Sequence, residues 1–231
     1  MRLVTFLLIL ASSWAFGASV PLVPGEVKYL PLMESEIERG WPAVPCRSCL
    51  ASQVRQETCP GLKSKRCWSP MAELKTNREY GFGLGQITVT SKFDNFKEVK
   101  KLDPSMRDWA WENRYNAQYQ LRALVLMDKF NFGKVSGAST EFDRLAFSIA
   151  AYNGGLGGVL SDRSVCRATP GCVSGRWFGH VENTSKKAKK AVAGYGKSFF
   201  EINREYVQHI MVDFPARYRP FFEEVPYVSA Y

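Results

Sequence analysis

Residues 48–59 contain the side chain best suited to chemistry, a glutamate that ends an amphipathic pattern. Leu50, Val54 and then Glu57 or Thr58 recur at helical spacing, and the first residue, Ser48, suits an N-cap. The pattern predicts a short helix with Glu57 on or beside its apolar face. A carboxyl there is costly to ionise, so its pKa should rise and keep it protonated near neutral pH, as a general acid requires. The alternative is a solvated glutamate that only closes the helix.

Residues 78–88 are rich in glycine. Gly81, Gly83 and Gly85 alternate with apolar residues, and Gln86 follows the last glycine. Because each glycine costs about 1 kcal/mol relative to alanine in a helix interior, we predict a tight turn or bulge where something approaches the backbone closely. A plain glycine-rich hairpin is the alternative. The spacing is wrong for a dinucleotide-binding fingerprint, and no strand precedes it.

A third stretch places two polar side chains at a predicted helix end. Thr140 suits an N-cap, with Asp143 at the returning position of a capping box. The apolar pattern that follows stops at Gly154-Gly155. Tyr152 and Asn153 should therefore lie at the helix C-terminus, exposed to whatever the glycine loop borders.

Composition limits the class of protein. The chain has 231 residues, which is long enough for one domain with a well-buried core. Its net charge of +9 gives that domain a basic surface. In an exported protein this charge favours polyanionic surfaces such as cell wall or outer-membrane lipid over nucleic acid. The lysine run at 186–190 has no interleaved aromatic residues for base stacking, so we interpret it as a solvated helix face.

The first residues and the cysteines indicate export. Residues 1–18 combine Arg2, an apolar run at 3–10 and small residues near 15–18, as in a cleaved secretory signal. An uncleaved anchor is the alternative, although the run is short for a stable membrane span. The six cysteines suggest disulfides, and the short loops between them favour three pairs: Cys46 with Cys49, Cys59 with Cys67, and Cys166 with Cys172. With two histidines in the chain, a zinc site at the first pair is not expected.

The remaining pattern predicts a mainly α fold whose strand signal is confined to the glycine stretch. The predicted divisions are an extended, proline-rich N-terminal arm at 19–46, a single helical domain at 47–214, and an irregular C-terminal strap at 215–231. Further helices are expected at 93–99, 103–130, 185–193 and 199–213, with an irregular segment at 156–179.

Three pieces now stand in order along the chain: Gln56-Glu57-Thr58, residues 81–87 and residues 151–155. Together they resemble motifs of the soluble lytic transglycosylases, a peptidoglycan-cleaving family that shares the goose-type lysozyme fold. The family pattern is a Glu-Ser pair, a Gly-Leu-Met-Gln loop and an Ala-Tyr-Asn-Ala-Gly helix end. Tyr206-Val207 resembles a fourth element. The resemblance covers roughly residues 47–212 and implies a lysozyme-like, disulfide-stapled helical domain with a minor β or loop element near the glycines.

The resemblance also implies roles for individual residues. Glu57 would be the catalytic acid and base, and Tyr206 would lie near its carboxyl. The residues implied to contact the sugar are Thr58, Gln86, Tyr152, Asn153 and Tyr206. No metal and no cofactor is implied.

Several positions depart from the family pattern. Thr58 replaces the serine, Gly85 replaces the loop methionine, and Ile202 stands where an acid often precedes the late tyrosine. The segment between Glu57 and Gln86 is also longer than usual. These departures suggest a divergent branch, such as phage- or conjugation-associated enzymes, and bear on substrate preference more than on chemistry.

The implied reaction is cleavage of the MurNAc–GlcNAc bond of peptidoglycan by one glutamate, forming 1,6-anhydro-MurNAc in the periplasm or cell envelope. Expected partners are glycan strands and, by the same resemblance, a secretion, conjugation or phage apparatus. A two-carboxylate muramidase using Glu79 or Asp94 is the first rival; Glu73 likewise lacks motif support. A non-catalytic wall-binding or structural protein is the second rival, and a disulfide oxidoreductase, which lacks its βαβ context, is the third.

Overall fold

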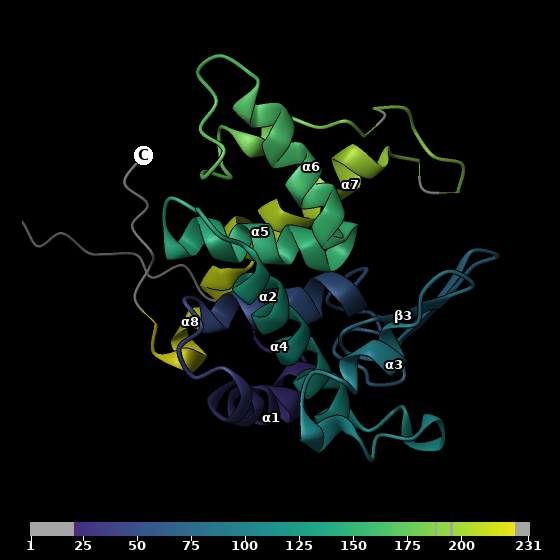
Figure 1. Ribbon diagram of the computed structural model, residues 1–231. Coiled ribbons are helices and arrows are strands. Elements are labelled where there is room, and N and C mark those ends of the chain that lie inside the picture. The colour runs from purple at the N-terminus through teal and green to yellow at the C-terminus, as the bar shows by residue number, and fades with distance from the viewer. Residues whose placement is uncertain (1–20, 188, 195, 225–231) are drawn as a thin grey trace, which may run out of the picture.

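The computed structural model describes residues 21–187, 189–194 and 196–224, and within them the protein is mainly helical (Figure 1). The predicted signal or anchor at 1–18 and the end of the predicted strap lie outside the described residues. The helices are α1 (Pro24–Gly40), α2 (Arg47–Thr58), α3 (Asn95–Val99), α4 (Ala117–Lys134), α5 (Glu141–Gly154), α6 (Leu156–Arg167), α7 (Phe199–Gln208) and α8 (Pro215–Phe222). The strands are β1 (Glu73–Lys75), β2 (Glu79–Phe82) and β3 (Ile87–Thr90).

The helical body is built around α2, which carries Glu57. In Figure 1, α2 lies between α5 on one side and α1 on the other. It packs against α8 and the π-helical turn His209–Asp213, while α1 packs on α4 and α5 packs on α4, α6 and α7. Leu50 and Val54, the two apolar positions of the predicted stripe, have no exposed surface. The stripe therefore anchors α2 in the core as its spacing predicted.

The glycine-rich stretch forms the turn of an antiparallel sheet with strand order β1-β2-β3, which projects from the helical body in Figure 1. Phe82 pairs with Ile87 across the turn. Gly83 has φ +77°, and a Cβ at this position would lie 2.3 Å from Cδ of Gln120. Leu84 N donates to Gln120 Oε1 at 2.9 Å. Both interpretations of this stretch are thus confirmed, because a hairpin is present and a side chain closely approaches its glycine backbone.

An aromatic cluster joins this sheet to α3 and α4. Phe96 packs edge-on against Trp109, with ring centroids 4.7 Å apart, and Phe82 contacts both rings. Trp109 stacks on Tyr119 at 5.8 Å. These buried contacts fix the position of the hairpin relative to α4.

All three predicted disulfides are present: Cys46–Cys49, Cys59–Cys67 and Cys166–Cys172. The first pair also replaces the predicted cap of α2. Cys46, not Ser48, is the N-cap residue, and its Sγ accepts from Cys49 N at 3.1 Å. The carboxylate of Glu224 accepts from Ser48 N at 3.0 Å, so a chain-distant anion completes this helix terminus.

The expectation of an extended arm at 19–46 is wrong, because α1 occupies most of it. Leu30, Met33 and Ile37 point into the core with no exposed surface, at helical spacing. Pro24 stands at the first helical position, where proline is well tolerated. Pro31 lies inside the helix on its exposed face, so the carbonyl that lacks its N–H partner faces water.

Three other predicted boundaries are also wrong. The helix expected at 103–130 begins at Ala117, because Asn116 accepts from Gln118 N at 2.9 Å and caps α4 there. Residues 156–167 form α6 and residues 215–222 form α8, where irregular chain was expected. The helix expected at 199–213 is present as α7 followed by the π-helical turn His209–Asp213, and Pro215 then begins α8.

The basic segment also differs from the prediction. Residues 185–187 and 189–193 are not helical. Lys187 pairs with Asp162 at 3.0 Å, and Lys189 lies over the Phe200 ring at 4.7 Å. These tertiary contacts hold the segment against α6 and α7 in an irregular course.

Candidate functional site

The carboxyl of Glu57 lies in the last turn of α2 and is met by a hydroxyl from α7. Tyr206 donates a hydrogen bond to Glu57 Oε1. Burial raises the pKa of Glu57 to about 8, and the Tyr206 hydrogen bond opposes this effect without cancelling it. Glu57 is therefore predominantly protonated at neutral pH, which is the state predicted from the sequence pattern.

Tyr206 is itself buried on α7, with 4 % of its surface exposed. Burial, followed by the charge of Glu57, raises the pKa of Tyr206 well above its ordinary value. The phenol therefore keeps its proton and remains a hydrogen-bond donor to the carboxyl whichever way Glu57 is ionised.

Tyr152 joins the C-terminal end of α5 to the glycine turn. Its hydroxyl donates to Gly85 O at 2.6 Å. Burial raises the pKa of Tyr152 well above its ordinary value, with a further contribution from the nearby Glu57 charge. A Cβ at residue 85 would lie 2.8 Å from the Tyr152 hydroxyl. This close approach accounts for glycine at the position where the family pattern has methionine.

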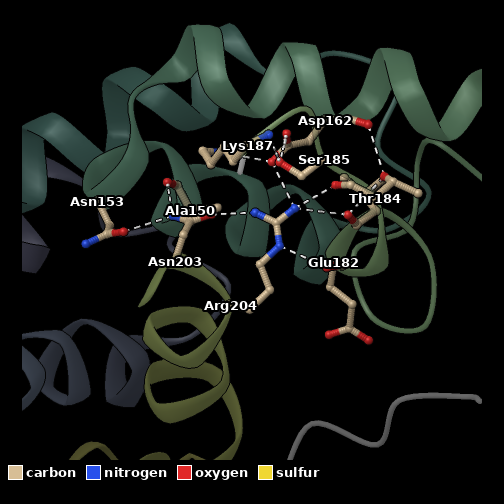
Figure 2. A network of polar contacts seen from close by, with 10 residues as sticks. Ala150, Asn153, Asp162, Glu182, Thr184, Ser185, Lys187, Asn203 and Arg204 are labelled. Carbon is tan, nitrogen blue, oxygen red and sulfur yellow. Dashed lines mark hydrogen bonds and ion pairs between the residues drawn. The ribbon is translucent and has the colours of Figure 1, made fainter. Parts of the chain in front are cut away.

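Asn153, the next residue, is held from α7 (Figure 2). Asn203 Nδ2 donates to Asn153 Oδ1 at 3.0 Å and to Ala150 O at 2.9 Å. Figure 2 shows the amide nitrogen of Asn153 directed away from Asn203. Asn203 therefore fixes the Asn153 side chain through its oxygen alone.

A buried ion-pair network between α6 and α7 holds Asn203, the residue that binds Asn153, in position. Arg204 Nη1 donates to Asn203 Oδ1 at 2.8 Å, and its Nη2 donates to Asp162 Oδ2 at 2.8 Å (Figure 2). Lys187 reaches the same Asp162 oxygen at 3.0 Å. Because Asp162 is 1 % exposed, these charges are paired where water is scarce and rigidly fix α7 against α6. Nothing in the sequence pattern signalled this network.

Thr58 and Gln86 are engaged with the backbone. Thr58 Oγ1 donates to Val54 O at 2.7 Å and accepts from Trp68 N at 3.0 Å. Gln86 Nε2 donates to Ala72 O at 3.1 Å and to Gly83 O at 2.9 Å. Among the described contacts, neither side chain touches Glu57. Thr58 fixes the chain that leaves α2, and Gln86 fixes the glycine turn.

A second buried carboxyl lies close to Glu57 and was missed from the sequence. Asp128 on α4 has no exposed surface, and within the described residues neither of its carboxyl oxygens has a hydrogen-bond partner of good geometry. Burial raises the pKa of Asp128 well above its ordinary value; the nearby Gln53 amide opposes this, and the Glu57 charge adds to it. Gln53 precedes Glu57 by one helical turn. The sequence does contain one sign of this buried acid, because Asp128 falls at helical spacing on the apolar stripe that includes Leu121 and Leu124.

The other acids considered as partners of Glu57 lie on or beside the sheet. Glu73 accepts hydrogen bonds from Tyr80 and Tyr115, which lower its pKa. Asp94 caps α3 by accepting from Lys97 N at 3.0 Å, and Glu79 lies on β2. No described contact joins any of these three to Glu57.

A cavity of about 480 Å³ opens beside Glu57. Gln56, Arg55 and His209 contribute to its wall, and His209 Nδ1 lies 3.0 Å from Gln56 Oε1. Of the residues predicted to contact the sugar, Thr58 lines this cavity, whereas Gln86, Tyr152, Asn153 and Tyr206 do not. A protonated carboxyl near a cavity can deliver its proton to a bound molecule. Within the described residues, no cluster of three or more histidine, cysteine or acidic side chains could hold a metal ion.

No protein-family model matches this chain, and no curated protein matches it. In the part of the chain that the structure describes, no helix is both long enough and apolar enough to cross a membrane.

Proposed function

We propose that the protein is an exported peptidoglycan-cleaving enzyme that cuts the MurNAc–GlcNAc bond by lytic transglycosylation. The observation that carries the proposal is the Glu57 carboxyl, whose pKa of about 8 leaves it protonated beside a cavity while Tyr206 holds one of its oxygens. The order of the motifs around Glu57, Gln86 and Tyr152 supplies the substrate class.

The proposed cycle uses one carboxyl twice. Protonated Glu57 gives its proton to the glycosidic oxygen as the bond from that oxygen to muramyl C1 breaks. The Glu57 carboxylate then accepts the proton of the muramyl C6 hydroxyl as that oxygen closes on C1. The product is a 1,6-anhydromuramyl end, and Glu57 is again protonated. Because the attacking hydroxyl is tethered to the reacting sugar, the second step has the entropic advantage of an intramolecular reaction.

The position of the other acids supports this mechanism over hydrolysis. An inverting hydrolase holds its second carboxylate about 6.5–9.5 Å from the first to activate water. Glu73 is engaged by two tyrosines, Asp94 caps a helix, and Asp128 is fully buried. None of these three is arranged to position water beside Glu57, so Glu79 on β2 is the acid left to the hydrolytic rival.

The protein's surroundings follow from its charge and disulfides. Three disulfides suit an oxidising compartment, and a net charge of +9 suits the polyanionic cell envelope. The proposed partner is the glycan strands of peptidoglycan. We further propose that the protein acts together with a secretion, conjugation or phage apparatus.

Mass spectrometry of muropeptides released by the purified protein tests this function. The expected products are 1,6-anhydromuramyl peptides without new reducing ends. Glu57→Gln should lower the rate by about 10²–10⁴-fold, the usual contribution of general acid–base catalysis. Glu141→Gln, at an exposed glutamate of α5, is the matched control and should retain full activity. Reducing-end muramic acid as the product would replace this mechanism with a hydrolytic muramidase.

A further inference from the structure

The wall of the cavity beside Glu57 carries positive charge that the proposed chemistry does not use. Arg55 and Arg66 both line the cavity. Neither arginine forms an ion pair with any residue that the structure describes. The acid among the lining residues is Glu57, which is largely neutral at pH 7. The cavity is therefore electropositive.

The aromatic ring of Phe214 holds two of the basic groups in position. The Arg55 guanidinium lies 3.9 Å from the ring centroid, and the His209 ring stacks on it at 5.2 Å. Stacking leaves the guanidinium edge, with its N–H donors, available to a ligand. Asp213 approaches His209 Nε2 at 3.8 Å. The arginine is thus preorganised by an uncharged surface, as suits recognition of a carboxylate.

A short basic loop that a disulfide closes also lines the cavity. The Cys59–Cys67 bond joins the two ends of the loop, and Trp68 N donates to Thr58 Oγ1 just beyond it. The loop contains Lys63, Lys65 and Arg66, and no acidic residue occurs between 58 and 72. This loop belongs to the segment that is longer than the family pattern, and of its three cations Arg66 lines the cavity.

We propose that this cavity is a carboxylate-binding subsite, in which Arg55 and Arg66 recognise the ionised peptide stems attached to the glycan strand. The inference rests on the proposed function, because it takes the substrate to be peptidoglycan. The first free carboxylate of a peptide stem is on its second residue, about 7–10 Å of extended chain from the muramyl sugar, so a cavity that Glu57 also lines can accept it. The subsite makes the enzyme selective for strands that still carry acidic stems.

Binding to Glu57→Gln, which cannot turn over its ligand, tests the subsite by calorimetry. Three soluble tetrasaccharides of alternating N-acetylglucosamine and N-acetylmuramic acid are compared. The first carries stems with free carboxylates, the second carries the same stems with amidated carboxylates, and the third has its stems removed. The acidic ligand should bind about 10–100-fold more tightly than either other ligand, because one charge-assisted hydrogen bond contributes about tenfold and two contribute about 100-fold.

Charge-removal variants in the same background supply the second comparison. Arg55→Gln/Arg66→Gln should abolish the preference for acidic stems and leave binding of the stripped ligand within about twofold of its parent. Arg107→Gln/Arg167→Gln removes two exposed arginines elsewhere and should keep the preference. Equal affinity for acidic and amidated stems would overturn the subsite, as would equal loss of all three ligands in the first variant.

Cleavage of stripped strands by the parent protein reports separately on the proposed function. If the parent releases anhydro products from stripped strands but shows no preference in binding, the function stands and the subsite fails. If no strand is cleaved but the acidic ligand is still preferred through Arg55 and Arg66, carboxylate recognition stands and the proposed reaction fails.

Discussion

Glu57→Gln should make the folded protein more stable at neutral pH while it removes the proposed activity. The pKa of Glu57 is about 8 in the folded protein, and a glutamate in an unfolded chain has a pKa of about 4.3. Between these values the folded state holds a proton that the unfolded state has released. Stability therefore falls as pH rises from about 4 to about 8, by about 1.4 kcal/mol for each pH unit.

At pH 7 the carboxyl then lowers the free energy of unfolding by about 3–4 kcal/mol, and the partial exposure of Glu57 reduces the expected value to about 2–3 kcal/mol. Glutamine keeps the volume and can still accept the Tyr206 hydrogen bond, so it removes this pH-dependent cost without opening a cavity. The other titratable groups around the carboxyl are Asp128, Tyr152 and Tyr206. They are present in both proteins and largely cancel in the difference.

Urea unfolding at pH 4.5, 6 and 7.5, with the disulfides oxidised, measures this effect. The stabilisation by Glu57→Gln should be near zero at pH 4.5 and grow steadily to pH 7.5. The exposed-site control Glu141→Gln should show no such growth. A stability difference that is the same at all three pH values would refute the raised pKa, and with it the basis for general acid catalysis.

The contacts of the site and of the glycine turn lead to four more expected outcomes. Activity should fall as pH rises through about 8, since the proton donor is then lost, and a pH–rate profile checks this. Tyr206→Phe removes the hydrogen bond that opposes the raised pKa of Glu57, so the alkaline limit of the same profile should move to higher pH. Asp128→Asn should stabilise the protein at neutral pH and have little effect near pH 4. The raised pKa of the buried acid lowers the free energy of unfolding only at pH values above the pKa of an aspartate in the unfolded chain, and urea unfolding at both pH values measures the difference. Gly83→Ala should destabilise by about 1–3 kcal/mol, because its Cβ would overlap the Gln120 amide at a positive φ, and a drop in thermal midpoint measures this.

The features that the sequence predicted well depend on neighbours close along the chain. The helix from Thr140 to Gly154 begins with the predicted cap, since Thr140 Oγ1 accepts from Asp143 N at 2.9 Å. The disulfides join cysteines three, eight and six residues apart, so short loops alone selected the correct pairs. The glycine hairpin likewise reports a local constraint on backbone dihedrals.

The errors occurred where distant parts of the chain override local propensity. Prolines suggested an extended arm before α2, but the arm is a helix because Leu30, Met33 and Ile37 bury an apolar stripe against α4. The buried Glu26 of this helix accepts from Tyr218 on α8 at 2.7 Å and pairs with Arg217. These contacts span nearly two hundred residues, which no local pattern can report.

The same limit applies to the candidate site. Sequence motifs singled out Glu57, Tyr152 and Tyr206, and these three are electrostatically coupled in the folded protein. The motifs gave no indication of Asp128 or of the pairing of Arg55 with Phe214, because each depends on which helices pack against α2. Burial and the Glu57 charge both raise the pKa of Asp128, which disfavours two negative charges close together. The polar groups that surround the Glu57 carboxyl therefore come from several elements, and a pattern within α2 could indicate the carboxyl but not Asp128.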